Sequence, residues 1–318
     1  MSAESAEVNP DKGGLRCPYY SGAEYHLELT PGTGPLETAG VVHVNVKVLE
    51  VFEPVTISPV LKVALGTTSP SILLPSTMIL KVYDRRYAND LRAFYDASDP
   101  SPESERAFRA FMSSQGAGPQ RSLQDWTRKR REDDEQDIMP PPEETEAYLA
   151  ALLASYHENE VRVYKRMAAM QGKEIPLFFG NTRFIESDAH PDMIDIKVSG
   201  ILLEYVEGTT LDKLPASAIS ASLCQKCVDI VQVFGDSGIL NNDVRLENFI
   251  VLSSPTQNRD VVMIDFAQTR LRGADEDDEQ WKRAKWSADE EGAIGYVLQK
   301  KCGWDYKPTY RYMVQAED

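Results

Sequence analysis

The chain has 318 residues, of which 42% are hydrophobic and 26% charged, so it is long enough to bury a core of its own. Its formal net charge of -16 argues against nucleic acid as the main partner, because the two charges are of the same sign. No apolar run approaches the length of a membrane-spanning helix, and four scattered cysteines make no disulfide framework. Together with a start, Met1-Ser2-Ala3-Glu4, that lacks the pattern of a signal sequence, these features favour a cytoplasmic or nuclear protein without a membrane partner.

The first predicted elements are strands of a small antiparallel sheet. Residues 1–39 are rich in Gly, Pro and Glu, so we expect a flexible N-terminal arm there. Apolar and polar residues alternate from Val42 to Val48, and a second strand is expected from Val60 to Leu65. The turn between these strands carries Thr56-Ile57-Ser58-Pro59 and no glycine.

A third strand is expected over Thr77-Met78-Ile79-Leu80-Lys81-Val82-Tyr83-Asp84, which is apolar on both faces. Lys81 shares one face with Ile79 and Tyr83. An ammonium group in such a strand requires an anionic partner. The alternative is a lysine that reaches solvent from an edge strand.

Residues 97–142 are rich in Ser, Pro, Gln and charge, and we expect one helical piece in them around Glu103 to Met112. The resemblance given below implies that this segment is an insertion. The basic run Arg128-Lys129-Arg130-Arg131 is followed at once by Glu132-Asp133-Asp134-Glu135. Such a block is typical of a solvated, self-neutralising linker, with a nuclear-import signal as the weaker alternative. The insertion is the candidate docking surface for a protein partner.

A long helix is predicted from Glu143 to Met167, opened by three prolines and an acidic first turn. Glu160 falls in the gap of its apolar stripe, whereas Glu158 lies off the stripe, so periodicity selects Glu160 as the inward acid. A cation about 4 Å from a buried carboxylate recovers about 4 kcal/mol at an effective dielectric near 20. Lys81 is the natural partner for this acid.

Further along the chain, Gly200 to Gly208 reads as an apolar strand that ends in a turn. An amphipathic helix is expected from Ala218 to Phe234. It contains Cys224 and Cys227, which we interpret as core and flank thiols because no second ligand pair follows at zinc spacing.

Two polar motifs near the C-terminal end carry the chemistry. Asn242-Asp243-Val244-Arg245-Leu246-Glu247-Asn248 precedes one apolar run, and a second run leads into Ile264-Asp265-Phe266-Ala267. Phosphoryl transfer requires an acid that orients the incoming hydroxyl and oxygen ligands for Mg²⁺, and Asp243, Asn248 and Asp265 are of the right types. Taken alone, the first motif can also be an ordinary polar turn.

The two motifs resemble the catalytic loop and the Asp-Phe-Gly metal motif of the protein-kinase-like superfamily. The resemblance implies that Asp243 is the catalytic base and that Asn248 and Asp265 bind Mg²⁺. It also implies that Arg245 steadies the transferred phosphate as a bidentate donor.

The same resemblance extends to the nucleotide. Lys81 lies in a strand similar to the family's Val-Ala-Ile-Lys strand, so it is expected to hold the phosphates of ATP while paired with Glu160. Backbone groups of Glu204 and Val206 would bind adenine, with Leu203 at the back of the pocket.

The resemblance covers roughly residues 41 to 313 and implies an α+β, bilobal protein-kinase-like fold. We expect a kinase-like N-lobe over 40–206, with a small antiparallel sheet, one long helix and the insertion at about 97–142. A shortened, mostly helical C-lobe over 207–318 should follow. In it, Asp289 is expected to brace the catalytic loop from a helix over about Ala288 to Lys301, and residues 275–279 occupy the place of an activation segment. Such a short C-lobe is similar to small-molecule phosphotransferases, such as choline and aminoglycoside kinases, and to the trimmed kinase-like proteins of filamentous fungi.

Two functions are consistent with this pattern. The first is an ATP- and Mg²⁺-dependent kinase that transfers the γ-phosphate to a hydroxyl of a protein or a small molecule. The second is a pseudokinase that acts as a nucleotide-binding or scaffold module. It is favoured by Asn241, Asn242 and Ala267 at positions where the family carries His, Arg and Gly, and by the turn without glycine.

Overall fold

The computed structural model describes residues 14–32, 40–66, 74–115, 122–185, 198–256 and 259–313. The chain is an α+β protein that divides into two compact units. The described residues of the first unit fall within Met1–Thr30, Gly40–Ser155 and Asn181–Leu202. Those of the second fall within Pro31–Ala39, Tyr156–Gly180 and Leu203–Asp318. This division differs from the expected lobes because residues 156–180 group with the C-terminal unit.

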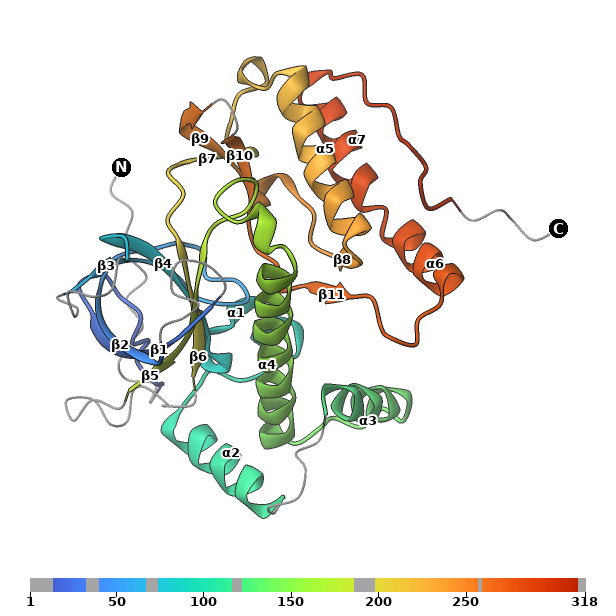
Figure 1. Cartoon of the computed structure of the whole chain (residues 1–318). Helices are drawn as coiled ribbons and strands as arrows, with labels where there is room; N and C mark the ends of the chain where they lie inside the picture. The colour runs from blue at the N-terminus through green and yellow to red at the C-terminus, as the bar shows by residue number, and fades with distance from the viewer. Residues whose placement is uncertain are drawn as a thin grey trace. The chain divides into compact units, whose positions relative to one another are not determined.

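The first unit is built around a closed sheet of six strands in the order β1-β2-β3-β4-β6-β5, in which the pairs from β1 to β4 are antiparallel (Figure 1). The strands are β1 (Glu24–Pro31), β2 (Val42–Val51), β3 (Val60–Leu65), β4 (Thr77–Tyr83), β5 (Phe178–Phe184) and β6 (Ser199–Glu204). The helical elements that follow β4 are η2 (Arg85–Tyr87), α1 (Asn89–Phe94), α2 (Pro102–Ser114), α3 (Leu123–Glu135) and α4 (Pro142–Arg166). The helix α4 and the strands β5 and β6 contribute residues to both units.

The second unit holds the remaining helices and two small sheets, one of three strands and one of two. Its elements are η3 (Ala168–Met170), β7 (Gly208–Thr210), η4 (Ala216–Ala218), α5 (Ala221–Asp236), β8 (Ile239–Asn241), η5 (Leu246–Asn248), β9 (Phe249–Thr256), β10 (Arg259–Met263), β11 (Thr269–Leu271), α6 (Asp278–Ala288) and α7 (Glu290–Cys302). In Figure 1, α5 and α7 run side by side. Cys227 is buried in α5, as expected for a core thiol. Cys224 is also fully buried, so its expected place on the flank of the helix is wrong.

The periodic elements form where the sequence predicts them. The strand expected at residues 77–84 is β4, in which Met78, Leu80 and Val82 are fully buried. The helix expected at 143–167 is α4, in which Glu160 is buried and Glu158 exposed. Residues 60–65 form β3. These elements carry strong periods of 2 or 3.6, which local sequence specifies directly.

The expectation of a flexible arm is wrong for residues 24–31. They form β1, which pairs antiparallel with β2 in a register that sets Leu27 opposite Val44. Tyr25, Leu27 and Leu29 are buried and alternate with polar residues, a period-2 pattern that the Gly- and Pro-rich surroundings obscured. Residues 1–13 and 33–39 of the expected arm lie outside the described residues.

The basic run in the insertion is also not a linker. It belongs to α3, where Lys129 Nζ lies 2.7 Å from Glu144 at the start of α4. The guanidinium of Arg130 lies over the rings of Tyr95 and Tyr148, at 4.6 and 5.4 Å from their centroids. The alternation of charge therefore reflects a helix whose cations are held by an acid and by aromatic rings, which composition alone does not reveal.

None of the helices in the described segments combines the length and the apolar character that crossing a membrane requires.

Candidate functional site

Two pairs of antiparallel strands in the second unit bring the two polar motifs together. The strand before the first motif, β8, pairs with the strand after the second, β11, so that Asn241 lies opposite Thr269. The strand after the first motif, β9, pairs with β10, so that Phe249 lies opposite Met263. The loop that carries Asp243 and Asn248 and the loop that carries Asp265 are therefore flanked by the same two strand pairs. Asp265 follows Met263 by two residues.

Hydrogen bonds fix the polar groups within this frame. Asn248 Nδ2 donates to the carbonyl and to the Oδ2 of Asp243, at 2.8 and 3.0 Å. The Ile264 amide donates to the carbonyl of Asn248 at 2.8 Å, which ties the second motif to the first. Asp265 has a φ of 63° and its Oδ1 accepts from the Ala267 amide at 3.3 Å. Aspartate is among the residues that adopt this left-handed conformation most readily.

Asp243 also has a cationic neighbour. Arg245 Nε lies 3.3 Å from Asp243 Oδ1, and the Arg245 side chain is about half exposed. An ion pair this open to solvent contributes little to stability. The guanidinium is therefore free to exchange the carboxylate for a more strongly charged anion such as a phosphate.

The donor set suits a hard divalent cation. Asp265 offers a carboxylate, and Asn248 offers its amide oxygen because its nitrogen is committed to Asp243. Among the described residues, no group of three or more His, Cys, Asp or Glu is placed to hold a metal ion. Mg²⁺ fits such a sparse oxygen set, since it is commonly bound by one or two carboxylates with substrate phosphates and water.

Aromatic packing holds the residue that follows Asp265. Phe266 is fully buried, with its ring centroid 5.2 Å from that of Tyr164 in α4 and 5.1 Å from that of Phe234 in α5. Tyr164 in turn stacks on Phe178 at 5.3 Å. This aromatic cluster fixes the turn at Asp265 to two helices, and the periodicity of α4 alone did not assign Tyr164 that role.

Tyr164 also reports the electrostatics of the site. Burial, followed by the nearby carboxylates of Glu160, Asp265 and Glu204, raises the pKa of Tyr164 well above its ordinary value. Its hydroxyl is buried and has no hydrogen-bond partner within the described segments. Glu160 and Asp265 thus act on the same buried phenol, which places both acids in one electrostatic environment.

The segment expected to bind adenine is anchored by the side chain of Glu204. Both oxygens of the Glu204 carboxylate accept from Arg259, at 2.7 and 2.9 Å, and the Leu177 amide donates to Oε2 at 3.0 Å. Leu203 and Val206 are buried. In the described part of the chain, no backbone hydrogen bond engages the amide or the carbonyl of Val206. Arg259 was not singled out from the sequence, because only the folded chain brings it beside Glu204.

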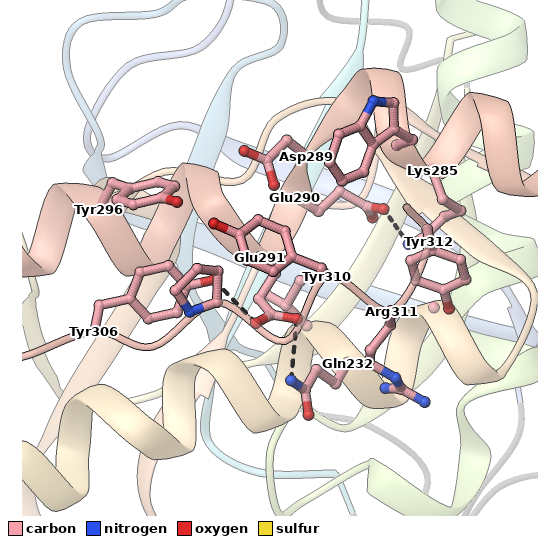
Figure 2. Close-up of a pocket in the computed structure, with 14 residues that line it drawn as sticks. Gln232, Lys285, Asp289, Glu290, Glu291, Tyr296, Tyr306, Tyr310, Arg311 and Tyr312 are labelled. Atoms are coloured by element: carbon pink, nitrogen blue, oxygen red, sulfur yellow. Dashed lines mark hydrogen bonds and ion pairs between the residues drawn. The ribbon is translucent and has the colours of Figure 1, made fainter. Parts of the chain in front are cut away.

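The brace for the loop that follows β8 comes from Glu290 and not from Asp289. Glu290 Oε1 accepts the Asn241 amide at 2.7 Å, and its other oxygen pairs with the buried Lys285 (Figure 2). Lys285 also donates to the Ile239 carbonyl at 3.2 Å, so the pair holds both ends of β8. Burial raises the pKa of Glu290 and lowers that of Lys285.

Asp289 takes a different position because it caps α7. Its φ is 41°, and its Oδ1 accepts the Gly292 amide at 3.2 Å. The left-handed residue separates α6 from α7, and the side chain that follows it, Glu290, is buried. The sequence could have indicated an acid at 289 or at 290, but the choice depends on this backbone conformation.

The acidic stretch at 275–279 is organised by arginines. Both oxygens of Glu276 accept from Arg270 at 2.8 Å, and the Gly273 amide donates to it at 3.1 Å. Hydrogen bonds from Arg270 lower the pKa of Glu276 to about 2. Asp277 then caps α6 by accepting the Gln280 amide at 2.8 Å. The segment is therefore ordered by an unmodified carboxylate.

In the first unit, Lys81 is buried in β4 opposite Val60 of β3. Its Nζ lies 5.8 Å from the centre of the Tyr83 ring. Gly200 lets β6 approach this strand, since a Cβ there would meet the Lys81 carbonyl at 2.8 Å. Lys81 and Glu160 belong to different units, and their pairing stays a prediction.

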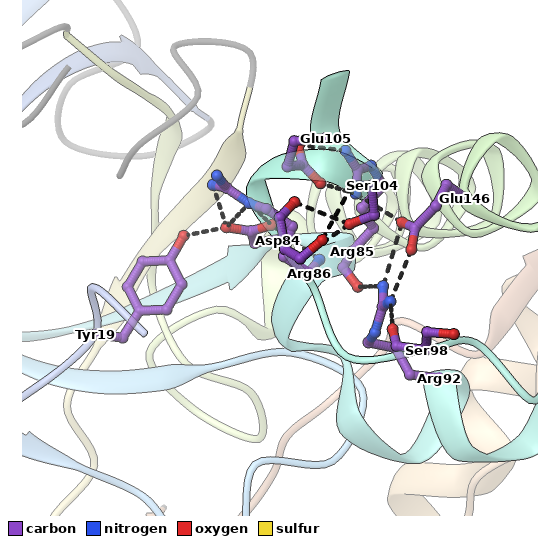
Figure 3. Close-up of polar contacts among 10 residues, drawn as sticks. Tyr19, Asp84, Arg85, Arg86, Arg92, Ser98, Ser104, Glu105 and Glu146 are labelled. Atoms are coloured by element: carbon purple, nitrogen blue, oxygen red, sulfur yellow. Dashed lines mark hydrogen bonds and ion pairs between the residues drawn. The ribbon is translucent and has the colours of Figure 1, made fainter. Parts of the chain in front are cut away.

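A network of buried ion pairs begins at Asp84, just after β4, and anchors part of the insertion (Figure 3). Arg85 makes two hydrogen bonds to Glu105 of α2, at 2.7 and 2.8 Å, and one of 2.6 Å to Glu146 of α4. Arg92 Nη2 lies 2.7 Å from the other oxygen of Glu146. The insertion contains two helices instead of the single one expected, and its first helix is fixed to α4 by buried charges.

Comparisons with known proteins give a limited result. No protein-family model matches the chain, and no curated protein matches it. Among solved structures, it is similar to the Rio2 kinase of Chaetomium thermophilum, determined as an ADP/Mg²⁺-phosphoaspartate complex. The identity is 11% and the TM-score 0.44, with 83% of this chain and 60% of that chain covered. The chain thus spans about 60% of the length of that protein.

Proposed function

We propose that the chain has a protein-kinase-like fold and is an ATP- and Mg²⁺-dependent phosphotransferase that acts on a hydroxyl acceptor. The observation that carries the proposal is that two strand pairings bring Asp243, Asn248 and Asp265 into one frame. Within it, Asn248 donates to Asp243, and the Ile264 amide beside Asp265 donates to the Asn248 carbonyl. The order of elements also supports it: a small antiparallel sheet, a long helix with an inward acid, and then a largely helical unit.

Each polar residue has a proposed task. Asp243 accepts or orients the proton of the acceptor hydroxyl, and Asn248 holds that carboxylate in place through its amide nitrogen. Asp265 and the amide oxygen of Asn248 would hold Mg²⁺, which supplies charge neutralisation for the phosphates when bound. Arg245 lies beside Asp243 and is available to bind the transferred phosphate.

The nucleotide groups are assigned from the sequence pattern. Lys81 would hold phosphates with Glu160 as its partner, and the backbone of Glu204 and Val206 would bind adenine beside Leu203. The free amide and carbonyl of Val206 are compatible with that role. The insertion stays the proposed surface for a protein partner.

The alternative is a pseudokinase, and one observation favours it. Asp243 already accepts from Asn248 and lies 3.3 Å from Arg245, so its carboxylate is engaged before an acceptor hydroxyl binds. In addition, the buried Asn241 occupies the position before Asn242 and Asp243 with its Nδ2 unpartnered within the described segments. A chain of this kind would bind nucleotide without transferring phosphate.

The test separates binding from transfer. Thermal unfolding is measured with and without Mg-ATP, since a ligand at about 100 times its Kd stabilises by about 2.7 kcal/mol. Transfer of radiolabelled γ-phosphate to water and to the protein's own hydroxyls is then compared for the wild type, Asp243→Ala and Glu247→Ala. Glu247 is an exposed acid of the same loop and serves as the matched control.

We expect Asp243→Ala to lower transfer by about 10²–10⁴-fold and Glu247→Ala to leave it unchanged. A thermal shift without any transfer supports the pseudokinase. The absence of a shift with Mg-ATP counts against both functions, and equal transfer by the wild type and Asp243→Ala counts against the assigned base.

A further inference from the structure

A cavity of about 290 Å³ lies in the second unit, away from the candidate catalytic residues (Figure 2). Its walls come from α5, from the end of α6 and the start of α7, and from the extended chain between Tyr306 and Tyr312. Neither Asp243 nor Asp265 lines it. The cavity is therefore a separate feature that the proposed function does not use.

Five of the fourteen residues that line the cavity are aromatic. The rings of Tyr296 and Tyr306 meet nearly at right angles with centroids 5.0 Å apart, and Trp286 lies 6.4 Å from Tyr310. The neighbouring Tyr310 hydroxyl raises the pKa of Tyr296. Trp286, Tyr296 and Tyr310 are 43%, 46% and 56% exposed. Exposed aromatic surface gathered around a cavity is typical of a binding site.

The extended chain is attached firmly enough to serve as a wall. Tyr306 donates its hydroxyl to Glu291 at 2.9 Å, and Thr309 donates to the same carboxylate from its amide and its hydroxyl. Gln232 of α5 donates to it at 3.1 Å, as Figure 2 shows. Burial opposes ionisation of Glu291, but these donors hold its pKa below the usual value. The carboxylate thus stays charged and joins α5, α7 and the extended chain.

The charges of the lining leave a negative balance. Lys285 is neutralised by Glu290, and Arg311 lies in an ion pair with Asp236. Glu291 has hydrogen-bond donors but no ion-pair partner, and the same holds for Asp289, within the part of the chain that the structure describes. An anionic ligand would therefore meet two uncompensated carboxylates.

We propose that this cavity binds a compact alkylammonium cation. The faces of Trp286 and the tyrosines attract a cation through their quadrupoles, and the Asp289 carboxylate adds a charge at the rim. The volume lies at the lower end of the range for small-molecule sites, which matches a head group of a few carbon atoms.

The test compares three water-soluble probes of similar shape and different charge: tetramethylammonium, tert-butanol and pivalate. Binding is measured by calorimetric titration without nucleotide, and the indole N–H signal of Trp286, assigned with Trp286→Phe, reports the location. We expect tetramethylammonium to bind at least about tenfold more tightly than tert-butanol and to shift the Trp286 signal, with no binding of pivalate. A titration with n-butylammonium separates recognition of a quaternary head group from recognition of a primary ammonium.

Two variants and one control locate the site. Asp289→Asn removes the charge but keeps a residue that caps helices and tolerates a positive φ, and we expect it to weaken tetramethylammonium binding by about tenfold. Tyr296→Leu should weaken binding by about threefold to fivefold. Val297→Ala changes an exposed neighbour that does not line the cavity, so its affinity should match the wild type.

Equal binding of tert-butanol and the cation overturns the proposal. So does an unchanged affinity in both folded variants, or binding that leaves the Trp286 signal in place. Because no assay uses ATP, these outcomes are independent of the proposed phosphotransfer.

Discussion

The Lys285–Glu290 pair should be the most consequential ion pair of the second unit for stability. The two side chains are 3% and 2% exposed, so neither charge is relieved by solvent. Glu290→Gln keeps an oxygen for the Asn241 amide but takes the carboxylate from the ammonium, which then has the Ile239 carbonyl and the rings of Trp281 and Tyr312. Breaking a buried pair by removing one partner costs about 3–5 kcal/mol, and we expect a loss of that size from Glu290→Gln and from Lys285→Met.

The double variant distinguishes pairing from simple burial. With both charges gone, no charge is left buried without a partner, so the two losses should not add. We expect a coupling energy of about 1–3 kcal/mol between the two sites. The assay is urea unfolding followed by the fluorescence of Trp281, which is buried in α6 with its ring 5.8 Å from Lys285 Nζ. Losses that add within about 0.5 kcal/mol would refute the reasoning, because independent sites behave in that way.

Three further predictions concern other parts of the chain. Glu146→Gln should destabilise the first unit by about 3–5 kcal/mol, because it removes the carboxylate shared by Arg85 and Arg92; a loss under about 1 kcal/mol in urea unfolding would contradict this. Tyr164→Phe should stabilise the protein by about 1 kcal/mol or more, because it removes a buried hydroxyl with no partner in the described residues; a lower midpoint of thermal unfolding would be the opposite outcome. Glu276 has a pKa lowered from 4.5 to about 2, so its stabilising contribution is present in full above about pH 4.5 and is lost as the pH falls toward 2. The NMR signal of the Gly273 amide, which donates to this carboxylate, should follow that transition, and a midpoint near 4.5 would show that the arginine contacts do not form in solution.

Local periodicity explains most of what could be predicted. The third strand and the long helix were located to within about one residue at each end, and the inward orientation of Glu160 followed from the helical period. The hairpin after the first motif could also be predicted, because two apolar runs flank a polar turn. In each case neighbouring residues alone set the pattern.

Other features escaped the sequence because distant segments decide them. The strand β1 lies within a region whose composition favours an arm, and it is stabilised by its pairing with β2. The helix α3 is held by contacts with Glu144, Tyr95 and Tyr148. The sequence of α3 itself does not indicate these contacts. The insertion likewise gained its order from Arg85, outside its own boundaries.

The proposed class of chemistry rests on the sequence by itself, since two acids and an amide at this spacing are the groups that phosphoryl transfer requires. Only the tertiary structure decided that Glu290, and not Asp289, supports the loop, because the left-handed Asp289 caps α7 while the side chain that follows it is buried. It also created the aromatic cavity, whose walls come from segments more than 50 residues apart in the chain. A local pattern specifies which groups a segment carries, whereas the path of the backbone decides which of them meet.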